Sequence, residues 1–462
     1  MKMRSLIGDR AFYRKLFAVL VPILIQNLIT NFVNLLDNIM VGQVGTEPMS
    51  GVAIVGQLIF VFSLCIFGGL AGVGIFTAQF FGKGDDEGVR STFRAKLYVA
   101  LGAVTLFFLV FLLRGEALIR LFLHEGREQL DLESTLAYGK AYMRVMLLQL
   151  LPFAISQVYA GTLRETGETL VPMKAGIAAV FANLIFNYIL IFGKFGFPAM
   201  GVIGAAVATV IARLVECGVV MFWTHTHTGR FRFIVGAYRS LRVPRPLARR
   251  MLRLGTPLLI NEVLWSAGMT TLNQCYSLRG LEVISALNIS STVTNLFLCA
   301  FFSTGNAIAI IIGQLLGAGE TERAVDEDRK LIAFALALSL LIGSLMACVA
   351  PLIPEIYNTT PLVKALSRDL LLVSAAAMPM NAYTNSCYFT LRSGGKTVIT
   401  FIFDGGFLWC IAVPTAFVLS RFTSMPILPM YIAVYALDLI KCAVGTWMLR
   451  RRKWVNNIVS GF

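Results

Sequence analysis

Three carboxylates lie within long apolar stretches of this chain, where an ionisable side chain is costly. Asp37, Glu262 and Asp404 have no basic residue within one helical turn in the sequence. A lone charge at membrane depth costs a few kcal/mol, and it persists where it binds an ion, a proton or a cationic ligand. Burial also disfavours the charged form of a carboxyl group, so such a residue can load and release protons near neutral pH. We therefore predict that these three residues bind a cation or a proton.

Two of the carboxylates belong to polar stripes on otherwise apolar helices. The first stripe has asparagines at spacings of four, three and four, with polar neighbours beside them: Gln26, Asn27, Asn31, Asn34, Asp37 and Asn38. The second runs through 261–274 and includes Glu262 and Asn273. Residues at such spacings share one helix face, and unpaired amides that face hydrocarbon cost several kcal/mol each. The stripes predict a shared cavity lined by Gln26, Asn27, Asn34 and Asn273.

The elements that must position these stripes are membrane-spanning helices. Of the 462 residues, 57% are hydrophobic and 14% are charged, and the mean hydropathy is +0.75. A helix needs about 20 mostly apolar residues to cross a bilayer, and about twelve runs reach that length. We predict an all-α membrane protein with spans at 16–43, 52–81, 92–113, 138–161, 170–193, 200–224, 250–278, 285–316, 330–350, 366–391, 397–420 and 427–449.

Basic residues outnumber acidic ones by 40 to 25, and they gather in alternate connections between the predicted spans. These are Lys83, Arg90, Arg94, Lys96, the arginines of 230–253 and the run 450–453. Positively charged connections stay in the cytoplasm, which predicts a multi-pass protein of the cytoplasmic (inner) membrane with both termini inside. We expect contact with anionic lipid and no nucleic-acid binding, because no soluble domain is present to carry it.

The chain contains two copies of one six-helix plan. At an offset of 235 residues, Pro22 aligns with Pro257, and the Gln79, Gly82 and Gly84 set aligns with Gln314, Gly317 and Gly319. At an offset of 228, the run TLRETGET (162–169) aligns with TLRSGGKT (390–397). Six is an even number, so both copies start on the same side, related by a pseudo-twofold axis along the membrane normal. The predicted parts are an N-terminal half (1–226), a basic linker (227–249) and a C-terminal half (250–462).

Other charges within the spans have partners nearby on their own helix. Arg213 and Glu216 are three residues apart, as are Asp438 and Lys441. Residues three apart share a helix face, so we predict that each couple forms an ion pair with a structural role.

Three classes of function remain open from these residues. An ion-coupled exporter of organic cations accounts for the lone carboxylates, with aromatic residues able to stack on a cation. A flippase for a lipid-linked or polysaccharide precursor is the alternative, and it favours an arginine-rich cavity that holds phosphates. An enzyme needs a cluster such as H-E-x-x-H or a nucleophile with its base, and three histidines near helix ends do not provide one. We predict no metal site, no ATP site and no cofactor other than a coupling ion.

The whole chain resembles the multidrug and toxic compound extrusion (MATE) family, NorM-like members in particular. The resemblance is carried by the duplicated halves, the run LLDNIMVGQVG (35–45), the Gln79-x-x-Gly82-x-Gly84 motif, the paired runs at 162–169 and 390–397, and NLIFNYILIFG (183–193). It implies an antiporter that expels organic cations in exchange for H⁺ or Na⁺ and alternates between outward-open and inward-open forms. We expect it to act as a monomer.

The resemblance also implies roles for particular residues. The family acid of the first helix corresponds to Asp37, and the acid of helix seven corresponds to Glu262. Where many relatives carry an acid in helix ten, this chain has Asn381 and Asn385; in helix five an N-x-x-x-D pattern is replaced by Asn183 and Asn187. Amides coordinate and hydrogen-bond but do not carry a proton. The coupling ion is therefore left open between H⁺ and Na⁺, and the charge rests on Asp37 and Glu262.

Overall fold

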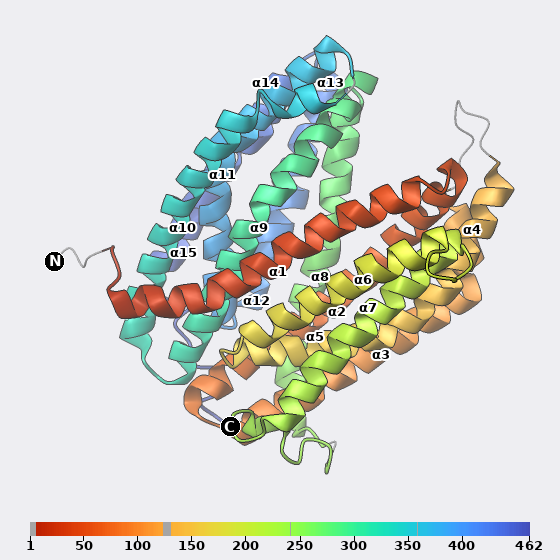
Figure 1. Ribbon diagram of the computed structural model, residues 1–462. Helices are drawn as coiled ribbons and strands as arrows, with labels where there is room; N and C mark the ends of the chain where they lie inside the picture. The colour runs from red at the N-terminus through yellow and green to blue at the C-terminus, as the bar shows by residue number, and fades with distance from the viewer. Residues whose placement is uncertain (1–5, 123–130, 241, 358) are drawn as a thin grey trace. The chain divides into compact units, whose positions relative to one another are not determined.

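The described part of the chain is helical throughout, without a strand (Figure 1). The computed structural model describes residues 6–122, 131–240, 242–357 and 359–462, without the side chains of 33–35, 38, 39, 46 and 281. The helices are α1 (Arg10–Gly42), α2 (Thr46–Lys83), α3 (Asp86–Arg120), α4 (Leu132–Met146), η1 (Leu147–Gln149), α5 (Leu150–Glu165), α6 (Leu170–Phe192), α7 (Gly201–Thr226), η2 (Arg232–Ile234), α8 (Arg245–Ser277), α9 (Leu281–Gly317), α10 (Thr321–Val349), η3 (Ile353–Ile356), α11 (Pro361–Ser393), α12 (Thr397–Phe401), η4 (Ile402–Gly406), η5 (Leu408–Ala412), α13 (Val413–Phe422), α14 (Ile427–Ala436) and α15 (Asp438–Arg450).

The helical segments confirm the predicted all-α membrane protein. Short helices join end to end in three of the predicted spans, so the elements form twelve long segments at the predicted positions. Ten described segments are long and apolar enough to cross a membrane. The two that fall outside this set are α8 and α11, each 33 residues long. Both contain many polar residues, so their assignment as spans rests on their length and stays a prediction.

The contacts divide the chain into two compact units. Unit 1 comprises 1–24, 78–84 and 252–462, and unit 2 comprises 25–77 and 85–251. The long helices α1 and α2 thus contribute residues to both. The division of the chain at the linker 227–249 stays a prediction.

Two glycines allow the ends of α2 and α9 to touch within unit 1. A Cβ added at Gly82 would lie 1.9 Å from the carbonyl oxygen of Gln314, and one added at Gly317 would lie 1.9 Å from that of Gln79. These four residues are the pairs that the 235-residue offset aligns. The repeated Gln-x-x-Gly motif therefore meets its own copy, and only glycine leaves room for the two backbones.

The C-terminal segment packs against the same place in unit 1. The Gln79 amide nitrogen donates to the Ser393 carbonyl at 2.9 Å, and its oxygen accepts from the Ile458 backbone N–H at 2.8 Å. Asn457 donates to the Gly317 carbonyl at 3.2 Å. Helix ends leave carbonyl groups without intrahelical partners. The C-terminal segment thus supplies a donor to the end of α9, and Gln79 of α2 supplies one to the end of α11.

Unit 2 buries a charge that the sequence analysis assigned to a cytoplasmic connection. Lys96 of α3 is fully buried; it pairs with Glu165 and donates to the Thr162 hydroxyl at 3.1 Å. In unit 1 the aligned Thr390 donates to the buried Asp328 of α10 at 2.5 Å. Lys96 is therefore bound inside its unit and does not lie free in a connection, and its role as an orientation charge stays a prediction. The two threonines occupy aligned positions, and each forms a hydrogen bond with a buried ionisable side chain: Thr162 with the basic Lys96 and Thr390 with the acidic Asp328.

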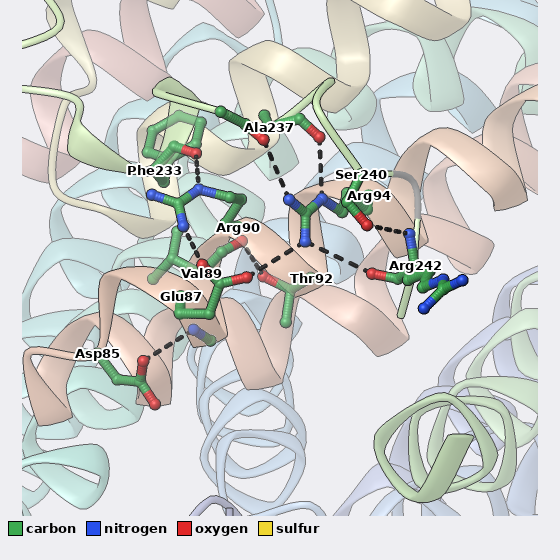
Figure 2. Close-up of polar contacts among 12 residues, drawn as sticks. Asp85, Glu87, Val89, Arg90, Thr92, Arg94, Phe233, Ala237, Ser240 and Arg242 are labelled. Carbon is green, nitrogen blue, oxygen red and sulfur yellow. Dashed lines mark hydrogen bonds and ion pairs between the residues drawn. The ribbon is translucent and has the colours of Figure 1, made fainter. Parts of the chain in front are cut away.

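The basic linker is fixed to the first turns of α3 in unit 2, as Figure 2 shows. Arg94 donates to the carbonyls of Ala237 at 2.9 Å, Gly236 at 3.1 Å and Arg242 at 3.4 Å. Arg90 donates to the Phe233 carbonyl at 3.1 Å. These guanidinium groups satisfy carbonyls of the described linker residues, which lie outside long helices, and they hold those residues against α3.

The α2–α9 contact makes a specific prediction about stability. Gly82→Val places side-chain atoms against the Gln314 backbone, and we expect it to destabilise the folded protein by about 1–3 kcal/mol or to prevent folding. The control is Gly56→Ala on the same helix, where an added Cβ has no atom within 4 Å. Thermal unfolding followed by size-exclusion fluorescence measures both. Equal melting temperatures for the two variants would contradict the contact.

The arginine contacts predict protection of the linker from proteolysis. Arg94→Ala removes the donors to three linker carbonyls, so local opening of 232–242 should become about tenfold more frequent. Chymotrypsin cleavage after Phe233 or Tyr238 reports this opening. Arg114→Ala, near the other end of α3, serves as the control. A linker that is cleaved at the same rate in both variants would show that Arg94 does not hold it.

Candidate functional site

Asp37 lies in unit 2 between two asparagine side chains of α6. The Asn187 amide nitrogen donates to Asp37 Oδ1 at 2.6 Å. With its amide assigned so that the nitrogen faces the carboxylate, as the negative charge there favours, Asn183 donates to the two oxygens of Asp37 at 2.7 and 3.0 Å. Asn183 and Asn187 are buried, one helical turn apart on the same face. The structure thus brings together three residues that the sequence analysis selected.

A cation within electrostatic range of this cluster is already paired. Arg213 of α7 is within electrostatic range of Asp37, but it donates to Glu216 at 2.8 Å and lies 5.1 Å from the centre of the Phe153 ring. The predicted Arg213–Glu216 pair is confirmed. Asp37 therefore has neutral amides as its hydrogen-bond partners.

The Asn187 amide oxygen has a different environment from its nitrogen. It is buried and has no hydrogen-bond partner among the described residues. A buried acceptor without a donor is unfavourable, so this oxygen is available to a ligand that brings a positive charge or a proton. Tyr142 of α4 is also buried and within electrostatic range of Asp37.

Unit 1 holds a second polar cluster, where α8 packs against the helix that begins at Thr397. Asn261 of α8 donates to Asp404 Oδ2 at 3.2 Å and accepts from the Gly405 backbone N–H at 3.0 Å. Trp409 Nε1 donates to the Leu264 carbonyl of α8 at 2.8 Å. Glu262 follows Asn261 directly, and Asp404 is within electrostatic range of it.

The helix that carries Asp404 departs from regular α-helical geometry at this point. Both η4 and η5 are π-helical. A π-helical turn shifts the hydrogen-bond ladder by one residue and is frequent at functional sites. Here the Gly405 N–H donates to the Asn261 amide oxygen, and the Asn261 amide nitrogen is oriented toward Asp404.

Asp404 has a cationic partner that its own helix does not provide. Lys441 of α15 donates to Asp404 Oδ1 at 2.6 Å, and the two side chains are 15% and 19% exposed. The ammonium also lies 5.2 Å from the centre of the Phe403 ring. The sequence analysis had paired Lys441 with Asp438 of its own helix; the structure gives it Asp404 instead.

The other predicted cavity residues have varied surroundings. Gln26 packs against Gly176 of α6 in unit 2, and Asn27 is half-buried. The side chain of Asn34 lies outside the described residues. In unit 1, Asn273 is exposed, and Asn381 donates to the Ala377 carbonyl of its own helix at 3.3 Å.

Among the amides that we predicted as cavity residues in unit 1, Asn385 of α11 has a buried oxygen with unmet hydrogen-bonding capacity. Its amide oxygen is buried without a partner among the described residues. A Cβ at Gly305 of α9 would lie 2.6 Å from that oxygen, so the oxygen faces a position where only glycine fits. The role of these residues in lining a substrate cavity stays a prediction.

Sequence reasoning missed three residues of these clusters. Asn261 lies in the second polar stripe, yet it bridges to Asp404 and to the Gly405 N–H, which belong to a different helix. Lys441 was assigned within its own helix. No sequence pattern indicates that Tyr142 lies near Asp37.

A family model described as MatE matches the chain twice, over residues 22–189 and 257–418. The two matches start 235 residues apart, which is the offset that the repeat analysis found. The chain is 25% identical over 457 residues to a probable multidrug resistance protein NorM of Thermotoga maritima, covering 96% of this chain and 94% of that protein. It is 24% identical to a probable multidrug resistance protein NorM of Bacillus subtilis, covering 96% of both.

Solved structures show the same fold. A crystal structure of a MATE protein in complex with MaL6 has a TM-score of 0.85 at 19% identity, covering 97% of both chains. An outward-facing multidrug resistance MATE family transporter of the MOP superfamily has a TM-score of 0.86 at 19% identity, covering 97% of this chain and 96% of that one. The family model spans well over half of the sequence, in both halves, and this multi-pass membrane chain therefore belongs to the MatE family of transporters.

Proposed function

We propose that this protein is a secondary active antiporter that exports organic cations in exchange for H⁺ or Na⁺ moving inward. The relatives are named as multidrug resistance proteins, which supports export of small molecules. The observation that carries the proposal is the state of Asp37: its hydrogen-bond partners are the amides of Asn183 and Asn187, while the nearby Arg213 is paired with Glu216.

The Asp37 cluster has the chemistry of an exchange site. Within the described part of the chain its carboxylate forms no ion pair with a cation, and the buried Asn187 oxygen is an additional acceptor. Carboxylate and amide oxygens suit a hard cation such as Na⁺, and a carboxylate also takes a proton. Either ion removes the charge that attracts an organic cation, so the ion and the drug compete.

Competition of this kind couples the two fluxes. A ligand shifts a two-state equilibrium only by its differential affinity for the two states. If the ion-loaded carboxylate favours one state and the drug-loaded carboxylate the other, the gradient of the ion drives drug export. No residue has to form a covalent bond with the substrate, and no ATP is consumed.

The same proposal covers the membrane location, the orientation and the number of chains of the protein. The arginines of the linker and of the C-terminal run favour a cytoplasmic location for both termini in the cytoplasmic (inner) membrane, in contact with anionic lipid. We propose that one chain is sufficient for transport.

The proposal predicts the effect of removing each charge. Asp37→Asn and Glu262→Gln keep the side-chain shape, and each should lower ethidium efflux from cells about tenfold or more, because interactions with a charged group contribute about 1.5–3 kcal/mol. Glu133→Gln, an exposed carboxylate of α4, should leave efflux unchanged. Amounts of folded protein are compared by size-exclusion fluorescence. Wild-type efflux with both site changes present would remove the mechanism.

The coupling ion is testable with purified protein. In proteoliposomes, ethidium movement should be driven by a proton gradient alone or by a sodium gradient alone, in the direction opposite to the ion. Liposomes without protein and liposomes with equal ion concentrations on both sides are the controls. Movement that needs neither gradient would contradict antiport, and translocation of a labelled lipid precursor in place of ethidium would favour a flippase.

A further inference from the structure

A row of buried polar groups on α11 takes no part in the hydrogen bonds of the two carboxylate clusters. Asn385, Tyr388 and Arg392 follow one another at spacings of three and four, so they share one face of the helix. Each has a buried atom without a hydrogen-bond partner among the described residues: the amide oxygen, the phenol hydroxyl and the guanidinium Nε. Native structures leave few buried polar atoms unpaired, and a bound ion is one of the usual reasons.

Arg392 is the charged member of this row, and its side chain is buried. The residue is 7% exposed, and within the described part of the chain its guanidinium belongs to no ion pair. The guanidinium carbon lies 5.3 Å from the centre of the Phe389 ring. Glu262 acts on Arg392 through its charge and the Tyr388 hydroxyl interacts with it, but neither gives Nε a hydrogen bond. Burying a cation without an ion-pair partner is costly, so an anion beside Nε stabilises the folded protein.

The aligned arginine of the other half forms the bond that Arg392 lacks. At the offset of 228, Arg392 aligns with Arg164 of α5. Arg164 Nε donates to the Ala160 carbonyl one turn back at 3.2 Å, whereas Arg392 Nε has no such partner among the described residues. At the position of Ala160, unit 1 has Tyr388, whose hydroxyl is the second unpaired donor of the row. Two neighbouring donors are therefore available in unit 1 where unit 2 has a closed hydrogen bond.

The acidic residues around the arginine of unit 2 have no counterpart at the aligned positions of unit 1. Glu165 and Glu216 act on that arginine through their charges. At the same offset, their places are taken by Ser393 and Val444. A neutral serine and an apolar valine do not compensate a guanidinium charge. Unit 1 thus has the basic residue of the repeat without its two acids, and a small anion from solution supplies the missing negative charge.

We propose that Arg392 and Tyr388 form a binding site for one small inorganic anion such as chloride. The anion accepts hydrogen bonds from Arg392 Nε and from the Tyr388 hydroxyl, which lie on the same side of α11 because the residues are four apart. Tyr388 is 8% exposed, and donors this deeply buried accommodate a small ion and not a large substrate. The Asn385 oxygen is an acceptor about 10 Å further along the helix, so it does not belong to this site.

This site goes beyond the proposed antiport, because it lies on donors that the exchange mechanism does not use. A purely structural arginine also behaves differently from an anion ligand. If packing on Phe389 is its whole role, Arg392→Gln destabilises the protein to the same extent in every salt. If the guanidinium binds an anion, the effect of the substitution depends on whether a fitting anion is present. The anion dependence of the melting temperature therefore separates the two roles.

The experiment measures thermal unfolding of purified protein in detergent, in sodium gluconate buffers to which sodium chloride is added at constant ionic strength. Gluconate is too large for the buried donors and serves as the reference anion. The wild-type melting temperature should rise with chloride and reach a plateau, as expected for one saturable site. Arg392→Gln should abolish this rise. Tyr388→Phe should weaken the apparent chloride affinity about tenfold, because it removes one hydrogen bond to a charged group.

Arg421→Gln is the matched control. Arg421 of α13 also packs on a phenylalanine ring, 5.4 Å from the centre of Phe417, but it is exposed. This variant should keep the full chloride response. Binding of radiolabelled chloride in a scintillation proximity assay gives a second readout that does not depend on unfolding. Tyr388→Phe keeps the side-chain shape and carries no charge change, so it retains the test if Arg392→Gln does not fold.

A wild-type melting temperature that is the same in chloride and gluconate, without binding of radiolabelled chloride, would overturn this inference. An unchanged chloride response in Arg392→Gln would overturn it as well, since the anion then binds elsewhere. Neither result touches the antiport proposal, which is tested separately by ion-driven movement of ethidium in proteoliposomes.

Discussion

A polar group in the hydrocarbon region must find its partner within the protein, and this constraint accounts for most of the described polar structure. Water is not available there to satisfy an amide or a charge. Lys96 is buried with Glu165 and Thr162, and Arg213 is paired with Glu216. These side chains satisfy one another. Other buried polar groups have hydrogen-bonding or ion-pairing capacity that the described residues do not fill. Among the described residues they include Asp37, which is held by amides, the amide oxygens of Asn187 and Asn385, and Glu262.

Duplication gave the chain two similar halves, and the charges within them have diverged. The glycines of the Gln-x-x-Gly motifs still meet at one crossing, because any side chain there would overlap a carbonyl oxygen. The aligned threonines Thr162 and Thr390 bind charges of opposite sign. A packing contact requires the same small residue in both copies, whereas a charge needs only a compensating partner, which can differ between copies.

Much of the fold followed from the sequence, since hydropathy locates spans and a constant offset reveals a repeat. The side-chain pairs were harder to predict, because spacing along one helix relates only residues of that helix. Lys441 was therefore assigned to Asp438, when its partner Asp404 lies on another helix. Lys96 was placed in a connection because its neighbours in sequence are basic. The Asp37 cluster was anticipated better, since the N-x-x-x-N spacing fixes two amides on one face of α6.

The most direct measurement is the release of ions when ethidium binds to the purified protein in weakly buffered detergent solution. A pH-indicator dye detects protons and a sodium-selective electrode detects sodium. The account predicts that one of the two ions is released in proportion to the ethidium bound, and that release is lost when Asp37 and Glu262 are both converted to amides. Binding of ethidium at undiminished affinity, with release of neither ion, would contradict the exchange of a small cation for a drug at these carboxylates.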